Sequence, residues 1–317
     1  MKKIINSIII IAIAVLVLAA CGSAPSSESA AEPASMNVMA STTFLADIAQ
    51  NVAGSRVQIN SLLPVGADPH SYQAAPSDVA KISESNVLIL NGLEYEHFIE
   101  QLLENAGGDR LVIEASTGLT PHTMEEHEGE AESESGEGHG HSAGDPHMWL
   151  DPNLVITYVE NIRDGLSKAD PDGEKDYTAN AEAYTDQLRD LDTWISEQVN
   201  TIPGNRRLLV TNHEALGYFA ERYGFEVTGS VIPSFSSNAA PSAQEMAKLI
   251  DEIKRLKAPA IFLDTADNSI LARQIADETG VMIVDGLHLE SLTEGTPAAT
   301  YIDMMKYNVL KIVEALK

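Results

Sequence analysis

The sequence predicts an α/β protein of two lobes, each built on a mostly parallel sheet and bridged by one long rigid α-helix. Two series of short apolar runs alternate with longer amphipathic stretches, a pattern typical of βα units. Between the two series, residues 175–202 contain no Gly or Pro, and their apolar side chains recur at helical spacing. The chain of 317 residues also exceeds the length at which a single hydrophobic core usually stops growing.

The first 20 residues predict an export signal. Two lysines precede an apolar run from Ile8 to Leu18, which ends in small residues before Cys21. The alternative, a permanent membrane helix, requires about 20 apolar residues, and this run stops short of that. Because Cys21 directly follows Leu-Ala-Ala, we expect a bacterial lipobox, removal of residues 1–20 and acylation of the Cys21 thiol. Residues 21–35 are rich in Ser, Ala, Glu and Pro and predict a flexible tether.

Residues 36–169 form the predicted N-terminal lobe. Strands are expected at Val57–Leu63, Val87–Leu90 and Leu111–Ile113, with helices at Pro76–Asn86 and Glu94–Asn105. Residues 122–144 mix Glu, Gly, Ser and His, and we interpret them as a disordered, solvated loop. The loop histidines are candidate weak metal ligands: His122, His127, His139 and His141. The alternative is a polar insert whose histidines are incidental.

Residues 170–203 hold the predicted linker helix, and residues 204–317 form the predicted C-terminal lobe. This lobe repeats the alternation of the first. Strands are expected at Leu208–Val210, Phe225–Val227, Ile261–Leu263 and Val281–Val284, with helices at Ala215–Tyr223, Ala243–Leu256 and Leu271–Thr279.

The acidic composition favours cations as ligands. The chain has 47 Asp and Glu residues against 20 Lys and Arg residues, for a formal net charge of −27. Such a charge repels the phosphates of nucleic acids and of anionic lipids, so we expect no nucleic-acid partner. Acidic surfaces also serve solubility alone, which makes particular residues the better guide to the ligand.

Three histidines predict a transition-metal site. His70 lies in Gly66–Tyr72, His147 in Asp145–Pro152 and His213 in Thr211–Phe219, each where a strand or loop leads into the next element. α/β folds place ligands at such positions, outside the carboxyl ends of strands. Asp-Pro precedes both His70 and His147; proline restricts φ, and the aspartate can accept the second imidazole N–H. Imidazole suits zinc and similar ions better than calcium or magnesium.

At these motifs the chain resembles the metal-binding lipoproteins of bacterial ABC importers for zinc and manganese, the cluster A-I solute-binding proteins. The resemblance extends over nearly the whole chain, from the lipobox at Cys21 through the three histidine motifs to a closing helix at Tyr301–Asn308. It implies a metal held between two α/β lobes, with no catalytic residues. It also implies a monomeric extracytoplasmic receptor, anchored through Cys21 at the outer face of the plasma membrane or in the periplasm, that delivers metal to a membrane permease.

The resemblance further implies a fourth ligand, a carboxylate late in the second lobe. The matching position is Glu290 in Leu287–Leu292, where relatives commonly carry Asp. Asp264 at the end of a predicted strand and Asp285 are the competing candidates.

The donor set favours Zn²⁺ as the bound ion. Members that select manganese tend to carry Glu where this chain has His213, and nitrogen-rich sites suit zinc whereas oxygen-rich sites suit harder ions. A His-rich acidic loop is also typical of zinc-binding members. A manganese or iron receptor of the same family is the alternative.

Two other classes of function compete with a metal receptor. A zinc hydrolase requires an open coordination position and a general base, but Gly217 stands where the second histidine of a His-Glu-x-x-His motif would follow His213. A surface adhesin is a label that members of this family have also carried, with no sequence feature of its own. His97 and His288 are expected to be surface or packed residues.

Overall fold

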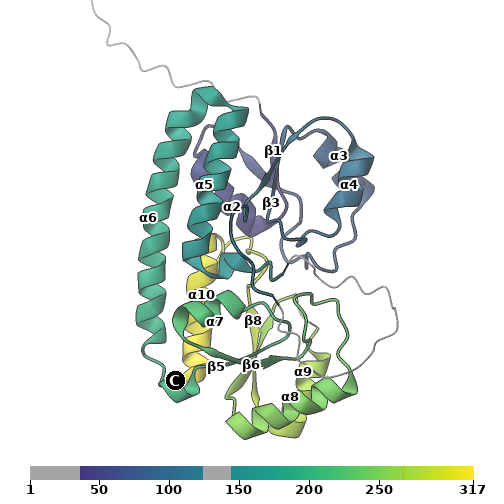
Figure 1. The fold of residues 1–317 in the computed structure, drawn as a ribbon, viewed down its shortest axis with the longest axis vertical. Coiled ribbons are helices and arrows are strands. Elements are labelled where there is room, and N and C mark those ends of the chain that lie inside the picture. The colour runs from purple at the N-terminus through teal and green to yellow at the C-terminus, as the bar shows by residue number, and fades with distance from the viewer. Residues whose placement is uncertain (1–35, 124–143, 267) are drawn as a thin grey trace, which may run out of the picture. The chain divides into compact units, whose positions relative to one another are not determined.

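Two four-stranded parallel sheets form the frame of the computed structural model, which describes residues 36–123, 144–266 and 268–317 (Figure 1). The predicted α/β class, with two lobes of parallel strands and one long helix, is confirmed. No helix within the described ranges is long and apolar enough to cross a membrane. The expected signal peptide and tether, and residues 124–143 of the expected loop, lie outside the described residues.

The first sheet has the strand order β2-β1-β3-β4. Its strands are β1 (Val38–Ala40), β2 (Ile59–Ser61), β3 (Val87–Leu90) and β4 (Leu111–Glu114), with helices α2 (Thr43–Ala53), α3 (Pro76–Ser83) and α4 (Ile99–Ala106) between them. Because side chains alternate along a strand, Val38 and Ala40 pack with α2, while Met39 packs with α3 and α4. Both faces are covered, which explains why these strands are continuous apolar runs.

The second sheet has the strand order β6-β5-β7-β8. Its elements are β5 (Leu208–Thr211), α7 (Gly217–Tyr223), β6 (Glu226–Ser230), α8 (Ala243–Leu256), β7 (Ala260–Asp264), α9 (Ile270–Thr279), β8 (Met282–Leu287) and α10 (Tyr301–Leu316). Val210 and Ile261 pack with α8 and α9, whereas Leu209 and Phe262 point into the cluster that holds α7 and α10. The alternation thus covers this sheet on both faces as well.

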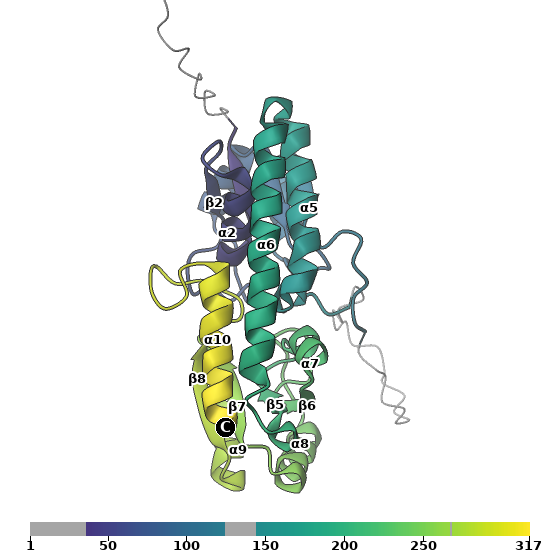
Figure 2. The same ribbon diagram turned by 90° about the vertical axis from the view of Figure 1, so that its left-hand side faces the viewer.

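Helix α6 (Glu174–Val199) runs beside both sheets (Figure 2). It packs against α2 and α5 (Pro152–Ala169) next to the first sheet, and against α7 and α10 next to the second. Its buried stripe includes the predicted Tyr177, Tyr184 and Leu188. Three short 3₁₀ turns complete the described elements: Met148–Leu150, Pro171–Gly173 and Gly204–Arg206. A single hydrophobic cluster follows α6 through both lobes, so the two sheets share one core.

The expected helix at Glu94–Asn105 is wrong at its start. Helix α4 begins at Ile99, because Gly92, Leu93 and Glu94 have φ values of 90°, 55° and 56°, which a right-handed helix does not allow. The other expected strands and helices are present, with ends shifted by a few residues.

Three elements were not expected: β1, α2 and α5. Helix α5 has a sequence signal, since Asp151 accepts a hydrogen bond from Asn153 N–H at 2.8 Å and Pro152 occupies the first helical position. That signal lies inside the motif of His147, so the same few residues both begin a helix and carry a candidate metal ligand.

We predict that Gly165→Ala destabilises the first lobe. Gly165 lies on α5 against β4, and a Cβ at this position would overlap Cδ1 of Ile113. The substitution should lower the free energy of unfolding by about 1–3 kcal/mol, although Ala is the better helix former by about 1 kcal/mol. Denaturant unfolding checks this, with Gly204→Ala as the control because no heavy atom lies within 4 Å of a Cβ there. A Gly165→Ala variant as stable as the unsubstituted protein would contradict the close packing.

Candidate metal centre

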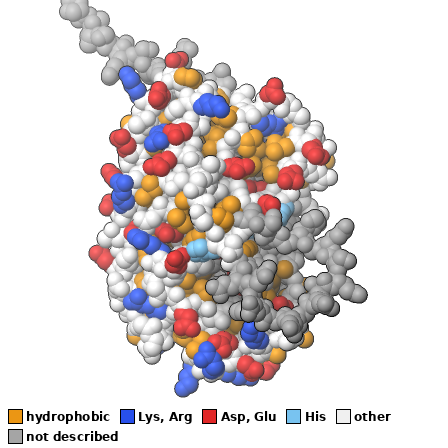
Figure 3. Space-filling model, in the orientation of Figure 1, with side chains coloured by type: hydrophobic (Ala, Val, Ile, Leu, Met, Phe, Trp, Pro, Cys, Tyr) orange, Lys and Arg blue, Asp and Glu red, His pale blue; other side chains and the backbone are white. Residues whose placement is uncertain are grey.

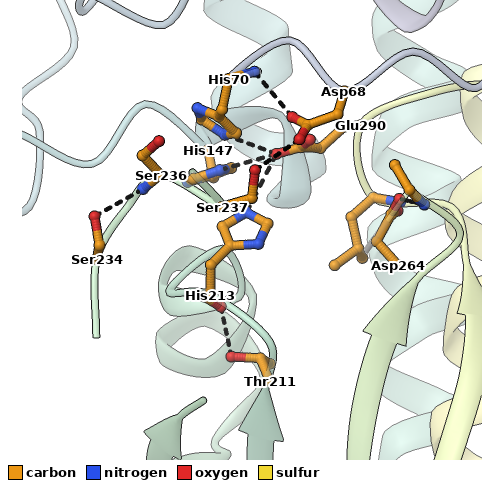
Figure 4. Close-up of polar contacts among 12 residues, drawn as sticks. Asp68, His70, His147, Thr211, His213, Ser234, Ser236, Ser237, Asp264 and Glu290 are labelled. Atoms are coloured by element: carbon orange, nitrogen blue, oxygen red, sulfur yellow. Dashed lines mark hydrogen bonds and ion pairs between the residues drawn. The ribbon is translucent and has the colours of Figure 1, made fainter. Parts of the chain in front are cut away.

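Four buried side chains from separate segments meet in one group. His70 follows β2, His147 precedes the turn at Met148–Leu150, His213 follows β5 and Glu290 follows β8. One ligand atom from each lies within 4.8 Å of the others, and Figure 4 shows the side chains pointing toward one another. They are the four residues expected to hold the metal, and in the part of the chain that the structure describes they are the one such group of His, Cys, Asp or Glu.

The Asp-Pro-His sequence makes the same backbone hydrogen bond at both of its occurrences. Asp68 Oδ1 accepts a hydrogen bond from the backbone N–H of His70, and Asp145 Oδ1 accepts one from the N–H of His147, both at 2.9 Å. Asp145 Oδ1 also lies 2.8 Å from Nδ1 of His147. With the proton on Nδ1, the Nε2 lone pair of His147 faces the group.

Glu290 is the centre of the group. Its Oε1 lies 2.9 Å from Nε2 of His70, 3.4 Å from Nε2 of His147 and 3.2 Å from Nε2 of His213. Around a tetrahedral Zn²⁺ with bonds of about 2.0–2.1 Å, neighbouring ligand atoms lie roughly 3.3 Å apart. The spacing of the three nitrogens from this oxygen therefore fits a transition-metal ion with little rearrangement.

The electrostatics of the group also favour a cation. Burial alone would raise the pKa of Glu290, but the charges and hydrogen bonds of the three histidines hold this pKa well below its usual value. Burial alone would lower the pKa of His147, yet its hydrogen bonds with Asp145 and Glu290 raise this pKa above the usual value. Positive charge is thus stabilised next to the carboxylate, and a metal ion can take the place of the imidazole protons.

The segment around Glu290 is held from two directions. Asp264 accepts a hydrogen bond from the N–H of Leu289 at 2.5 Å, and Trp149 Nε1 donates to the carbonyl of Leu289 at 2.7 Å. Asp264 therefore positions the segment and lies outside the four-residue group. Asp285, the other competitor, also lies outside it, and its carbonyl accepts a hydrogen bond from Lys311.

Aromatic rings close off the group. Tyr95 is fully buried and meets the His70 ring edge-on at 5.2 Å, and Trp149 lies 5.2 Å from the His147 ring. His213 is positioned by its backbone, because Thr211 Oγ1 donates to its carbonyl at 2.6 Å at the end of β5. The group is therefore shielded from water, which strengthens each electrostatic interaction within it.

The remaining histidines lie elsewhere. His122 Nε2 is 2.8 Å from Glu221 Oε2, and the His122 ring stacks on Tyr218 at 4.1 Å. His127, His139 and His141, the other candidate weak ligands, and the lipidation candidate Cys21 lie outside the described residues. His97 lines a cavity of the first lobe, and the ring of His288 packs on Tyr307.

Sequence reasoning missed two side chains that cross between the lobes near the site. Ser237 Oγ donates to Asp68 Oδ2 at 2.8 Å, and Tyr218 OH donates to the carbonyl of Asp145 at 2.8 Å. Ser237 lies in a polar run after β6, and Tyr218 lies in the motif of His213. Both follow a strand of the second sheet, which is the signal that points to them.

The surface charge is mixed in sign on the face that Figure 3 draws. In Figure 3, acidic and basic side chains are interspersed over the face that is shown. The formal net charge of −27 is therefore not gathered into one patch on that face. Selection of a cation depends on the buried group.

Comparisons with known proteins agree with this geometry. A family described as the periplasmic component A of the zinc-uptake complex matches residues 38–315. The manganese-binding lipoprotein MntA of Halalkalibacterium halodurans is 36% identical over 317 residues, which is 100% of this chain and 99% of the relative. The manganese ABC transporter substrate-binding lipoprotein PsaA of Streptococcus mitis is 30% identical, with the same coverage of 100% and 99%.

Solved structures extend the similarity to the fold. The Mn-bound periplasmic metal binding protein of Candidatus Liberibacter asiaticus superposes with a TM-score of 0.76 at 28% identity, covering 89% of this chain and 100% of that one. The periplasmic zinc binding protein TroA of Treponema pallidum gives a TM-score of 0.75 at 29% identity, covering 89% of this chain and 99% of that one.

We predict that metal affinity falls as the pH is lowered. A histidine must be neutral to bind a metal, and the raised pKa of His147 means that protons compete for it already above the ordinary value of about 6.5. Competition with a chelator of known affinity, measured from pH 8 to pH 5.5 by roughly half-unit steps, checks this. An affinity that stays constant between about pH 7.5 and 5.5 would contradict a site of three imidazoles.

Proposed function

The chain belongs to the family of periplasmic zinc-uptake components and is an extracytoplasmic metal-binding receptor of an ABC transporter, and we propose that its cargo is Zn²⁺. The family binds a substrate for transport and is not an enzyme. In the proposed cycle, the protein captures the ion with His70, His147, His213 and Glu290 and delivers it to a membrane permease.

The donor set is the observation that carries the choice of zinc. Three imidazole nitrogens and one carboxylate oxygen form a set of four donors, and the distances from the oxygen to the three nitrogens match those around a tetrahedral ion. Manganese prefers carboxylate, carbonyl and water ligands, often with six-fold coordination. The site offers one carboxylate in a buried, aromatic-lined surrounding, which supports the softer and four-coordinate ion.

Manganese is the second candidate, since two relatives that cover the whole chain are named for manganese. Glu290 has a second carboxylate oxygen, and bidentate coordination by it would add an oxygen donor for the harder ion. The ratio of the two affinities is therefore the quantity that separates the two proposals.

The cellular arrangement that we propose follows from the N-terminal sequence. Residues 1–20 direct export, the Cys21 thiol carries a lipid, and residues 21–35 tether the metal-binding part to the membrane surface. The receptor acts as a monomer that meets the permease while anchored.

Metal analysis of protein purified without added metal, followed by competition between Zn²⁺ and Mn²⁺, tests the cargo. One tightly bound Zn²⁺ per chain is the expected result.

We predict that His213→Ala weakens zinc binding far more than removal of residues 124–143. Loss of a ligand should cost more than about 100-fold in affinity, because loss of a residue that merely supports a ligand already costs about 10–100-fold. Removal of 124–143 should cost less than about tenfold, since His70, His147, His213 and Glu290 all lie outside that segment. Titration against a chelator measures both. If the deletion abolished tight binding and His213→Ala did not, the assignment of the site would be wrong.

We predict that His213→Glu shifts selectivity toward Mn²⁺. The substitution replaces a borderline nitrogen donor with a harder anionic oxygen at the end of β5. Zinc can still bind more tightly in absolute terms, because Mn²⁺ stands lowest in the Irving–Williams order. The measurement is the ratio of Zn²⁺ to Mn²⁺ affinity in one buffer. An unchanged ratio, with both metals still bound, would show that His213 does not contact the metal.

A further inference from the structure

The four ligands come from both lobes. His70 and His147 belong to the first lobe by sequence, and His213 belongs to the second, where Thr211 Oγ1 donates to its carbonyl at the end of β5. The segment of Glu290 is bonded to both lobes: Trp149 Nε1 donates to Leu289 O at 2.7 Å, and Leu289 N–H donates to Asp264 Oδ2 at the end of β7.

The segments next to His213 are joined to the other three ligands by two side-chain hydrogen bonds. Ser237, from the loop after β6, donates to Asp68 Oδ2 at 2.8 Å, as Figure 4 shows. Tyr218, from α7, donates to the carbonyl of Asp145 at 2.8 Å. Tyr218 is almost fully buried, and its hydroxyl also accepts a hydrogen bond from the N–H of His122 at 3.0 Å.

Both bonds end on the aspartates that hold the ligands of the first lobe. The Asp68 carboxylate receives Ser237 on Oδ2 while its Oδ1 receives the backbone N–H of His70. The carbonyl of Asp145 accepts from Tyr218, while its Oδ1 accepts from the backbone N–H of His147 and lies 2.8 Å from Nδ1 of the same residue. Each Asp-Pro-His motif is therefore contacted from the lobe that carries His213.

We propose that Ser237 and Tyr218 are positioning residues that hold the His213 side of the site against the His70 and His147 side, and so set the rate at which metal is released. The inference rests on the proposed function, capture and release of a divalent cation. Neither side chain is a metal ligand; each acts through an aspartate. The ion can leave only after the ligand set opens, and separation of His213 from His70 and His147 breaks both bonds.

The expected effect is on dissociation more than on association. The two bonds exist only when the four ligands are assembled, so their loss favours the opened state from which the ion departs. Loss of one hydrogen bond changes the equilibrium constant between the assembled and the opened state a few-fold. Loss of a hydrogen bond to a charged acceptor changes this constant by more. The shared core along α6 holds the sheets in place and includes Tyr218 and Phe219 of α7, which leaves the loop after β6 as the segment that moves.

The test is metal release from the purified full chain. Wild type, Ser237→Ala, Tyr218→Phe and the double variant are loaded with one equivalent of Zn²⁺ and mixed with an excess of a fluorescent zinc chelator. Each single substitution should raise the dissociation rate about three- to tenfold, and the double variant should approach the product of the two. The association rate of Zn²⁺ and the thermal midpoint of the metal-free protein should change little.

Matched controls separate positioning from general loss of a hydroxyl. Ser236 lies in the same loop as Ser237, and its hydroxyl accepts a hydrogen bond from Asn238 N–H at 3.3 Å. Ser236→Ala removes this hydroxyl. Tyr223 lies on the same helix as Tyr218, and its hydroxyl donates a hydrogen bond to Asp192 of α6 at 2.9 Å. Tyr223→Phe removes this hydroxyl. Both should release zinc at the wild-type rate. Ser237→Thr retains the hydroxyl and should release zinc as slowly as the wild type. The comparison of Ser237→Ala with Ser237→Thr tests the proposal even if Tyr218→Phe folds poorly.

The outcomes are distinct. Faster release in Ser237→Ala and Tyr218→Phe, with slow release in both controls and in Ser237→Thr, supports the proposal. Wild-type rates in both test variants, or equal acceleration in the controls, would overturn it. A wild-type protein that retains no zinc or manganese would instead overturn the proposed function on which the inference rests.

Discussion

The structure depends on one electrostatic constraint, the burial of the Glu290 carboxylate among three imidazoles. A carboxylate removed from water is costly unless positive charge or hydrogen bonds replace its hydration. Here the three Nε2 atoms lie 2.9 Å, 3.4 Å and 3.2 Å from one oxygen, and they lower the pKa of Glu290 well below its usual value. The same arrangement that holds the carboxylate ionised without metal is the one that a divalent cation needs.

The fold brings the carboxyl ends of strands from two sheets to one place, and this places the three imidazoles around the Glu290 carboxylate. His213 and Glu290 lie just after the ends of β5 and β8, where α/β folds carry their ligands, and His70 lies in the loop that follows β2. Helix α6 packs beside both sheets and shares their core, so the relative position of the two ends is fixed by apolar packing. The polar contacts around the three histidines and Glu290 then adjust positions that packing has already set.

Much of the fold and of the site could be predicted from the sequence because the signals are local. The Asp-Pro-His motifs place a hydrogen-bond acceptor two residues before the ligand, and in the structure Asp68 and Asp145 hold His70 and His147 in this way. Periodicity likewise located α6 and most strands. Glu290 was different: it required a resemblance to relatives, because a single carboxylate after a strand has no spacing that separates it from Asp264 or Asp285.

The parts that could not be predicted depend on contacts between residues far apart in the sequence. Nothing local indicates that Trp149 would bond the carbonyl of Leu289, or that Ser237 would reach Asp68. The predicted start of α4 was also wrong. The positive φ values of Leu93 and Glu94 contradict the ordinary helical preference of these residues and are set by the surrounding structure.

The division of the ligands bears on how a receptor with this site can release its cargo. Three nitrogens and an anionic oxygen in a buried site bind Zn²⁺ tightly, and by the Irving–Williams order they bind Mn²⁺ more weakly. A receptor that must hand over its ion therefore gains from a ligand set that can be broken at one point. In the proposed cycle His213 is that point, since its segment is bonded within the second lobe, His70 and His147 are held within the first lobe, and the segment of Glu290 is bonded to both. In that proposed cycle, withdrawal of a single imidazole would remove a neutral donor, which would cost less than withdrawing the charged carboxylate from the ion.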